Sequence, residues 1–182
     1  GGLGFIGSHT ASVLLSAGHE VVILDNLSNS KLDVIERIES ITDSRVIFFE
    51  GDVNDTSLVE RILAAHKINA VIHFAGSKSV GESNEKPIEY YENNVSGTIS
   101  LLKAMSRFEV RKLIFSSSAT VYGIPNYLPI DEKHQTAAIN PYGRTKLHIE
   151  EILSDVATSN RDWRIICLRY FNPVGAHESG LI

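Results

Sequence analysis

Gly1-Gly2-Leu3-Gly4-Phe5-Ile6-Gly7, the first stretch of the sequence, decides the fold. It satisfies the dinucleotide-binding pattern G-x-G-x-x-G and also the variant G-x-x-G-x-x-G. Glycines in these positions let the backbone turn tightly and approach a pyrophosphate, which binds at the N-terminus of the helix that follows. A glycine-rich turn without a ligand is the alternative interpretation. The helical pattern over residues 6–17 and the later acidic Asp25 disfavour it.

Asp25 lies at the end of the apolar run Val21-Val22-Ile23-Leu24 and 18 positions after Gly7. In a dinucleotide-binding unit, an acidic residue at about this distance accepts hydrogen bonds from the hydroxyls of the adenosine ribose. Its negative charge would also repel a 2′-phosphate. This residue therefore favours NAD over NADP as the cofactor.

Short apolar runs alternate with longer amphipathic stretches along the chain. This alternation is typical of βαβ units and predicts an α/β fold with a doubly wound parallel sheet of the Rossmann type. Because the runs are nearly continuously apolar, helices are expected on both faces of the sheet. The predicted strands are Val21–Asp25, Val46–Gly51, Ala70–Ala75, Lys112–Ser117 and Ile165–Phe171. The predicted helices are residues 6–17, 31–40, 56–66, 87–107 and 141–158, with Pro87 tolerated in the first turn of the fourth.

A doubly wound fold places a strand directly before its glycine-rich turn, whereas this sequence begins at the turn itself. We therefore expect a first strand upstream of Gly1, in the middle of a sheet with the order 3-2-1-4-5-6. Residues 1–173 are predicted to form an N-terminally truncated NAD-binding domain. Residues 174–182 are predicted to begin a substrate-binding region whose remainder follows in a longer parent chain.

Composition disfavours several classes of function. The 182 residues carry a formal net charge of −5 and no basic run that could neutralise a series of phosphates, so nucleic acid is not an expected partner. No apolar stretch approaches the roughly 20 residues that cross a bilayer, so no membrane attachment is expected. The single Cys167 cannot form an internal disulfide and fits a buried thiol in a cytoplasmic protein. The seven histidines lack metal-ligand spacing, so no metal site is expected.

Polar residues and one glycine follow successive apolar runs at the same end. In an open parallel sheet, ligands bind outside the carboxyl ends of the strands, so these residues are expected to meet in one crevice. Each of them alone also fits an ordinary turn, but their recurrence favours a ligand site. The residues are Asp25, Asp52, Gly76, Ser116–Ser118 and Asn172.

Tyr142 and Lys146 are four residues apart and therefore neighbours on one helical face. The same face continues through the apolar Ile149, Leu153 and Val156, which predicts that the lysine points towards the sheet and not into water. A Tyr-x-x-x-Lys pair on an exposed helix surface is the alternative. The position of the pair on the apolar stripe favours a functional site.

The chemistry of a hydroxyl oxidation calls for these residue types. A tyrosine hydroxyl has a pKa near 10 and is a poor base at neutral pH. The Lys146 ammonium and the positive charge of a nicotinamide are expected to favour the Tyr142 phenolate and so lower its pKa. Tyr142 then accepts the proton of a substrate hydroxyl while hydride leaves the same carbon, and Ser118 hydrogen-bonds the reacting oxygen. Ser118, Tyr142 and Lys146 are the predicted catalytic residues.

The glycine pattern, the serine stretch and the Tyr-x-x-x-Lys pair together resemble the extended short-chain dehydrogenase/reductase superfamily. Longer strings narrow the resemblance to its UDP-glucose 4-epimerase (UDP-galactose 4-epimerase) family, over essentially the whole sequence. The strings run from Gly1 to His9, from Leu24 to Leu27, from Val71 to Gly76, from Phe115 to Gly123 and from Leu168 to Ala176.

The resemblance implies an isomerase that uses NAD to invert C4 of a UDP-hexose, UDP-galactose to UDP-glucose, through a transient 4-keto intermediate with no net redox change. Related dehydratases carry acidic residues after the active-site serine or threonine, and here Ala119 and Thr120 stand there. Another nucleotide-sugar epimerase, a net NAD-dependent oxidoreductase and a non-catalytic NAD-binding module stay as alternatives. The sequence leaves open whether N-acetylated sugars are accepted. The resemblance also suggests a homodimer.

The resemblance assigns site residues one by one. Among the cofactor-binding residues, Asn94 is an alternative to Asn93. Among the substrate-binding residues, Phe171 is either a core residue or an aromatic that packs on the sugar. The predicted substrate-binding residues are Ser118, Tyr142, Phe171 and Asn172. The predicted cofactor-binding residues are Gly1, Gly4, Phe5, Ile6, Gly7, Asp25, Asn26, Asp52, Val53, Phe74, Ala75, Gly76, Lys78, Asn93, Ser116, Tyr142, Lys146 and Tyr170.

Overall fold

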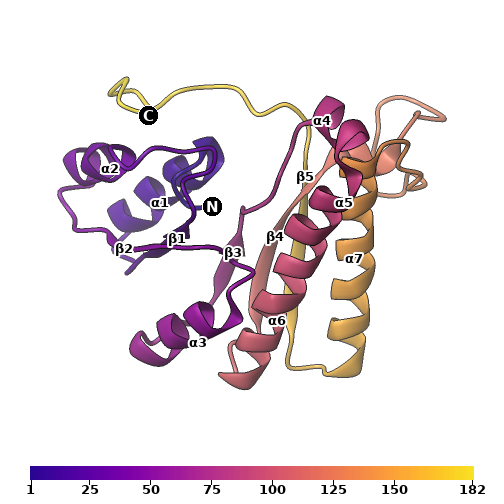
Figure 1. Ribbon diagram of the computed structural model, residues 1–182. Coiled ribbons are helices and arrows are strands. Elements are labelled where there is room, and N and C mark those ends of the chain that lie inside the picture. Colours follow the sequence, from indigo (N-terminus) through magenta and orange to yellow (C-terminus); the bar gives the residue numbers. More distant parts are fainter.

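Strands and helices alternate along the chain in the computed structural model, which describes all residues from 1 to 182 (Figure 1). The strands pair in parallel within two sheets, β1 with β2, and β3 with β4 and β5. All five predicted strands are confirmed, with ends that differ by at most two residues. The strands are β1 (Val22–Asp25), β2 (Ile47–Glu50), β3 (Val71–His73), β4 (Lys112–Ser118) and β5 (Arg164–Tyr170).

The end of β3 differs most from the prediction, because the strand stops at His73 and not at Ala75. Its residues pair with Leu113–Phe115 of β4, and the chain then turns at Gly76 with a φ of 149°. Residues other than glycine rarely adopt this φ, and a Cβ on Gly76 would also lie 2.9 Å from Asn94 Oδ1. The glycine thus turns the chain away from the sheet edge and into the loop that borders the site.

Four of the five predicted helices are confirmed as single α-helices, although α2 begins three residues later than predicted. The predicted helix over residues 87–107 is helical throughout but has three parts, with a π-helical turn, η1, in the middle. Apolar periodicity does not reveal a π-helical turn, because it inserts one residue without changing the pattern on either side. The helices are α1 (Phe5–Ser16), α2 (Val34–Thr42), α3 (Thr56–Ala65), α5 (Pro87–Tyr90), η1 (Tyr91–Ser96), α6 (Gly97–Arg107) and α7 (Pro141–Ser159).

Two short elements were not predicted. The helix α4 (Val80–Glu85) has one turn and a half and is mostly polar, so it shows no apolar stripe; Ser79 caps it by accepting a hydrogen bond from Glu82 N at 3.3 Å. The 3₁₀ turn η2 (Ala119–Tyr122) continues directly from β4, and Ser118 caps it through Thr120 N at 3.2 Å. Both elements border the site.

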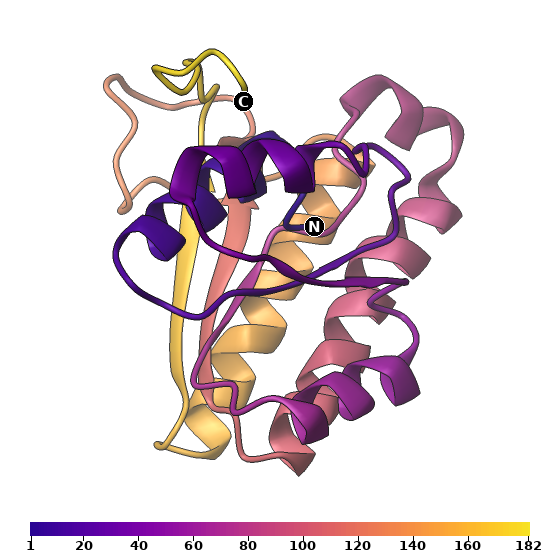
Figure 2. The same cartoon turned by 90° about the vertical axis from the view of Figure 1, so that its left-hand side faces the viewer.

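Two apolar clusters make up the core. The larger one joins α3, α6 and α7 to the strands β3–β5, with Phe115, Met105 and Leu153 among its fully buried side chains. The smaller one joins α1 and α2 to β1 around Ile23 and Ile38. Figure 2, seen from the side of α1 and α2, shows α6 and α7 to the right of β4 and β5. Helices on opposite sides of the strands confirm the doubly wound arrangement, and no helix is long and apolar enough to span a membrane.

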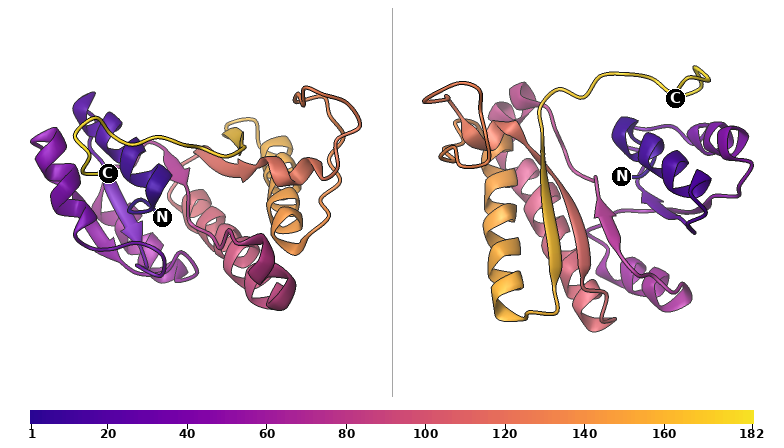
Figure 3. Two further views of the ribbon diagram at one scale, coloured as in Figure 1. Left: turned by 90° about the horizontal axis from the view of Figure 1, so that it is seen from above. Right: turned by 180° about the vertical axis from the view of Figure 1, so that it is seen from behind.

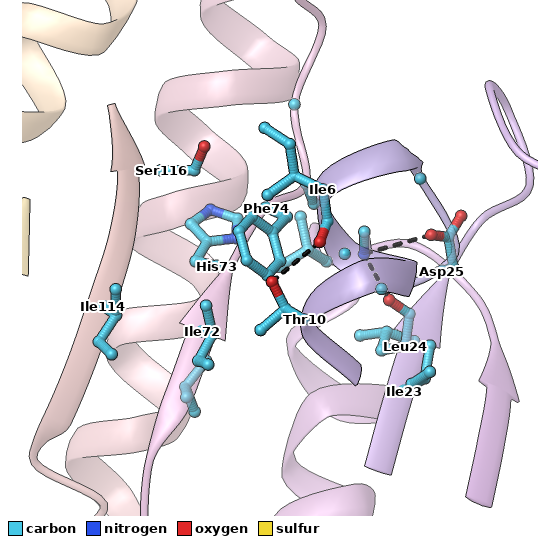
Figure 4. A pocket seen from close by; sticks show the side chains of 18 of the residues that line it. Ile6, Thr10, Ile23, Leu24, Asp25, Ile72, His73, Phe74, Ile114 and Ser116 are labelled. Atoms are coloured by element: carbon cyan, nitrogen blue, oxygen red, sulfur yellow. Dashed lines mark hydrogen bonds and ion pairs between the residues drawn. The ribbon is translucent and has the colours of Figure 1, made fainter. Parts of the chain in front are cut away.

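A slot separates the two sheets, because β1 and β3 are not hydrogen-bonded to each other. Figure 4 shows Ile23 and Leu24 of β1 on one side of this space and Ile72 of β3 on the other. The expected sheet order places the strand before Gly1 at this position. That upstream strand and the domain boundary at residue 173 stay predictions.

Within residues 1–182, one face of β5 is not covered by a helix. Ile166 and Leu168 are 55% and 39% exposed, and no helix covers their face in the view from behind (Figure 3, right). The segment after Tyr170 forms no helix or strand and runs across to α2, where Arg37 Nη1 donates to Leu181 O at 3.1 Å.

Candidate active site

One cavity at the carboxyl ends of the strands is lined by every residue predicted for the site. Its volume is about 1760 Å³, above the range of about 300–1,000 Å³ that is usual for ligand pockets, because the slot between β1 and β3 opens into it. The predicted crevice is therefore confirmed. Its polar lining includes Asp25, Asp52, Gly76, Ser116, Ser117, Ser118 and Asn172.

The glycine-rich turn packs too closely against its neighbours to hold side chains. A Cβ on Gly1 would lie 2.4 Å from Ala75 N, and a Cβ on Gly7 would lie 2.4 Å from Gly1 O. No side chain caps the N-terminus of α1, and its first turn holds no acidic residue. The free N–H groups and the helix dipole therefore suit an anion such as the pyrophosphate of a dinucleotide.

Asp25 is buried and already accepts three hydrogen bonds: from Leu3 N at 3.0 Å, from Leu27 N at 3.0 Å and from Ser30 Oγ at 2.9 Å. Burial acts to raise the pKa of its carboxyl, whereas the hydrogen bonds from Leu3, Leu27 and Ser30 act to lower it. The carboxylate thus links the glycine-rich turn to the end of β1. It also lines the cavity, so its remaining acceptor positions can face a ribose.

Asn26 and Asp52 meet across the ends of β1 and β2, with Asn26 Nδ2 donating to Asp52 Oδ2 at 2.7 Å. Asp52 Oδ1 accepts from the backbone N–H of Asn54 at 2.8 Å. Burial acts to raise the pKa of Asp52. The hydrogen bonds from Asn54 and Asn26 act in the opposite direction, and the pKa lies below its ordinary value. Lys78 is exposed at the rim of the same cavity and pairs with no carboxylate, so its cation is available to a phosphate.

The two candidate asparagines of η1 have different roles. Asn94 is buried and braces the loop after β3: its Oδ1 accepts from Ser77 N at 2.8 Å, and its Nδ2 donates to Ser77 O and Thr145 Oγ1, both at 3.0 Å. Asn93 donates to Ser77 Oγ at 2.9 Å and lines the cavity, whereas Asn94 does not line it. The geometry favours Asn93 as the asparagine that faces a ligand. The π-helical turn allows both residues to reach Ser77.

Tyr142 and Lys146 face the sheet, as predicted. Lys146 is 5% exposed, and its ammonium donates to Ser116 O at 2.9 Å. The same ammonium lies 6.0 Å from the centre of the Tyr142 ring and 4.8 Å from that of Phe115. Burial lowers the pKa of Lys146 to about 8. The lysine is thus a buried cation held on the end of β4 and beside the tyrosine.

Ser118 is oriented by the turn that follows it. Its Oγ accepts from Thr120 N at 3.2 Å and from Thr120 Oγ1 at 3.0 Å. Because a serine hydroxyl has two acceptor positions and one proton, these contacts leave the proton free to be donated. Ser118 also lines the cavity with Tyr142, so its proton is available to the oxygen of a substrate or to the tyrosine.

Lys146 alone does not bring the pKa of Tyr142 below its ordinary value; the expected lowering included the charge of a nicotinamide and stays a prediction. Burial raises the pKa of the Tyr142 hydroxyl above its ordinary value, and a hydrogen bond with Ser118 offsets only part of this effect. Lys146, whose ammonium lies 6.0 Å from the centre of the Tyr142 ring, does not offset the effect of burial. Lowering the pKa of Tyr142 to the neutral range therefore needs an additional positive charge in the cavity.

The last strand supplies the outer wall. Tyr170, at the end of β5, and Asn172 line the cavity. Phe171 lines it as well and is 58% exposed in this part of the protein; its assignment as a core or sugar-packing aromatic stays a prediction. Phe74 and Ala75 come from the loop after β3, on the side of the glycine-rich turn.

Sequence reasoning missed three residues that orient the site. Ser30 holds the Asp25 carboxylate, Ser77 is the point to which both asparagines bind, and Thr120 orients Ser118. Serine and threonine in loops are ordinary turn residues, so their types carry no signal. Only the position of Thr120, two residues after a predicted catalytic serine, could have identified one of them.

The sequence is similar to proteins of one family. The model of the NAD dependent epimerase/dehydratase family matches residues 1–181. UDP-glucose 4-epimerase of Dictyostelium discoideum is 54% identical over 182 residues, and that of Bacillus subtilis (strain 168) is 51% identical over 182 residues. Both matches include 100% of this chain but only 53% and 54% of the relatives. The chain thus spans about half the length of the curated relatives it matches.

Solved structures agree with the sequence matches. UDP-glucose 4-epimerase from Bifidobacterium longum, in complex with NAD⁺ and UDP, is 54% identical, with a TM-score of 0.98 over 100% of this chain and 54% of that chain. UDP-glucose-4-epimerase from Stenotrophomonas maltophila, with bound NAD and formylated UDP-arabinopyranose, is 49% identical, with a TM-score of 0.97 over the same shares. With the matched fold, the glycine-rich turn and the Ser, Tyr and Lys side chains around one cavity, the chain belongs to the NAD dependent epimerase/dehydratase family.

Proposed function

We propose that the protein containing this chain interconverts UDP-galactose and UDP-glucose by NAD-dependent epimerisation at C4, with no net redox change. The observation that carries the proposal is the meeting of Ser118, Tyr142 and Lys146 in the cavity that also holds the glycine-rich turn. The named relatives, at 51–54% identity over the whole chain, support the same activity.

The residues around the turn fit a dinucleotide. The N-terminus of α1 and Lys78 are suited to the two phosphates, and Asp25 to the adenosine ribose. The Asp25 carboxylate opposes a 2′-phosphate by its charge, which favours NAD. When bound, NAD supplies a hydride acceptor that is also a hydride donor, together with the positive charge that the Tyr142 phenolate needs.

Tyr142 is the residue that moves the proton. Its hydroxyl, as phenolate, accepts the proton of the C4 hydroxyl when the 4-keto sugar forms, and returns it when the alcohol forms again. Ser118 donates a hydrogen bond to the C4 oxygen and so fixes the position of this oxygen. Lys146 favours the phenolate from 6.0 Å away and is held there by Ser116 O. The keto sugar must present its opposite face before the hydride returns.

A dehydratase is disfavoured by the residues after Ser118. Removal of water from a nucleotide sugar needs an additional acid and base, and Ala119 has no ionisable group. Thr120 is engaged with Ser118 through its hydroxyl. A net oxidoreductase would use the same three residues, so only the fate of the hydride distinguishes it. A non-catalytic NAD-binding module is disfavoured because the three residues are intact.

Two properties of the whole protein belong to the same proposal, a homodimer and a cytoplasmic location. The second is supported by the single cysteine, Cys167, which forms no internal disulfide, as is usual in a reducing compartment. Acceptance of N-acetylated sugars depends on groups around the sugar ring, beyond the three residues that act at C4.

Retention of hydrogen at C4 tests the proposed reaction directly. Full-length protein is given UDP-galactose that carries deuterium at C4, and the UDP-glucose formed is isolated by chromatography and analysed by mass spectrometry. We expect nearly complete retention of deuterium and turnover without added NADH. Loss of the label to water would exclude a returned hydride, and a requirement for stoichiometric NADH would indicate a net oxidoreductase.

Replacement of Tyr142 by Phe should remove the proton transfer and keep the fold. Since general acid–base catalysis contributes about 10²- to 10⁴-fold, kcat should fall by about this factor while bound NAD is retained. The control is Tyr127→Phe, which changes an exposed tyrosine outside the cavity. Turnover of UDP-galactose by Tyr142→Phe at the rate of the control would show that Tyr142 is not the base.

Replacement of Asp25 by Ser should weaken the preference for NAD. The variant loses the charge that opposes a 2′-phosphate, so the ratio of the Kd values for NADP and NAD, measured by calorimetry on cofactor-free protein, should decrease. Asp162→Ser, an exposed change outside the cavity, is the control. Unchanged selectivity in Asp25→Ser, or tighter binding of NADP than NAD by the unaltered protein, would contradict the assignment.

The buried Lys146 should make folding stability depend on alkaline pH. Its pKa is about 8 in the folded protein against 10.5 when unfolded, so the unfolded state binds the proton more tightly between these values. Above pH 10.5 the buried Lys146 is neutral in both states and costs no stability. As the pH falls to about 8, the free energy of unfolding decreases by roughly 3 kcal/mol, because the unfolded state takes up the proton first. Lys146→Met should lack this loss and also turn over slowly.

Urea denaturation at pH 7.5 and pH 10 measures this effect. The free energy of unfolding of Lys146→Met, relative to that of the unaltered protein, should be higher at pH 7.5 than at pH 10. Lys103→Met, a change of an exposed lysine on α6, should show no such difference. Equal differences at both pH values would mean that the Lys146 ammonium has an ordinary pKa.

A further inference from the structure

A partly buried ion pair lies behind the site and outside its cavity. Glu150, on α7 one turn beyond Lys146, has a side chain that is only 10% exposed. Its carboxylate accepts from Arg169 Nη2 at 2.6 Å, from Arg169 Nε at 3.0 Å and from Ser117 Oγ at 2.5 Å. A carboxylate that accepts hydrogen bonds from two nitrogens of a guanidinium and from a hydroxyl has a fixed orientation.

Arg169 extends the contact to a fourth segment. Its Nη1 donates to Tyr122 OH at 3.0 Å, and its Cζ lies 4.8 Å from the centre of the Tyr122 ring. The hydrogen bonds to Glu150 raise the pKa of the guanidinium, which is therefore always charged. The pair connects α7, the end of β4, η2 and the end of β5.

Each of these segments carries a residue of the proposed site. Ser117 is followed by Ser118 on β4, and Arg169 by Tyr170 on β5; the two strands pair at both positions. None of the side chains of Glu150, Arg169 and Tyr122 lines the cavity. They do not contact a ligand in the cavity and can affect the reaction by placing the residues that do.

The connection between α7 and β4 shows what the pair can place. Two side chains of α7 hydrogen-bond to the end of β4, Lys146 to Ser116 O and Glu150 to Ser117 Oγ, one helical turn apart. Two anchors fix both the distance and the tilt of a helix, whereas one anchor leaves it free to rock. The Glu150 anchor therefore restrains the distances between Lys146, Tyr142 and Ser118.

Stability alone does not require an ion pair here. Apolar side chains of similar volume often replace a buried ion pair at no cost in stability, because two charges are costly to remove from water. What an ion pair with several hydrogen bonds provides is a single geometry. A shift of about 1 Å at a reacting group can reduce turnover about 100-fold.

We propose that Glu150, held by Arg169, is a positioning residue for the reaction: it fixes α7 against the end of β4 so that Tyr142 and Lys146 face Ser118. The proposal rests on the proposed function for its effect on turnover. Its effect on Tyr142 is independent of the identity of the substrate.

The test compares Glu150→Gln with Glu151→Gln in full-length protein with NAD bound. The control makes the same substitution on the next residue of α7, where the side chain is exposed. For Glu150→Gln we expect kcat with UDP-galactose to fall about 10- to 100-fold, with KM and NAD content nearly unchanged. The control should retain the kcat of the unaltered protein.

The pH dependence of kcat separates positioning from simple electrostatics. If Lys146 is displaced, it favours the Tyr142 phenolate less, and the acid limb of the profile moves to higher pH. Loss of a negative charge without displacement would favour the phenolate and move the limb to lower pH. A shift to lower pH, or unchanged kcat with a lower Tm, would overturn the proposal and leave Glu150 a stabilising residue only.

Two additional measurements keep the test decisive. If Glu150→Gln does not fold, Ser117→Ala removes one anchor without leaving a charge unpaired, and the same changes in kcat and pH profile are expected from it. If the unaltered protein does not epimerise UDP-galactose, the proposed function fails. The phenolate absorbance of Tyr142, taken as the difference from Tyr142→Phe, then still decides: a higher pKa in Glu150→Gln supports positioning, and an unchanged or lower pKa overturns it.

Discussion

The hydrogen bond from the buried Lys146 ammonium to the carbonyl of Ser116 is the contact on which the arrangement of the site depends. It joins the helix that carries Tyr142 to the strand that ends in Ser118. A cation in this position is costly, because burial disfavours its charge. The surrounding structure makes the position tenable, through the ring of Phe115 below it and the Glu150 anchor one turn away. The buried Lys146 ammonium thus lowers the stability of the fold and provides the charge that the proposed chemistry needs.

At the cofactor end of the cavity, single residues also serve both the fold and the binding of a ligand. Asp25 holds the glycine-rich turn through Leu3 N and is also the residue proposed to select the cofactor. Asn94 holds the loop after β3 through Ser77 and frees Asn93 to face the cavity. Residues at strand ends therefore connect segments of the fold and present groups to a ligand at once. A substitution at one of them is expected to alter both stability and binding, which is why matched control variants are needed.

The positions of Tyr142 and Lys146 could be predicted from the sequence, but the pKa of Tyr142 could not. The spacing of Tyr142 and Lys146 correctly placed both on one face of α7, and the apolar stripe correctly turned that face inward. Lys146 alone does not lower the pKa of the tyrosine, because the inward face that brings the lysine near also removes water from the hydroxyl. Spacing reports proximity, whereas a pKa depends on the balance of burial against charge. That balance is known only when the packing is known.

The sequence by itself determined the five strands, the main helices, the crevice at the carboxyl ends of the strands and the residues that line it. The strands, the helices and the crevice follow from periodicity and from the geometry of parallel sheets, whereas most of the lining residues were assigned by resemblance to a known family. Only the tertiary structure decided the π-helical turn at Asn93 and Asn94, the bracing roles of Ser30, Ser77 and Thr120, and the pairing of Glu150 with Arg169. Glutamate on a helix and arginine in a strand carry no sign of each other, because their contact depends on how α7 lies across β4 and β5.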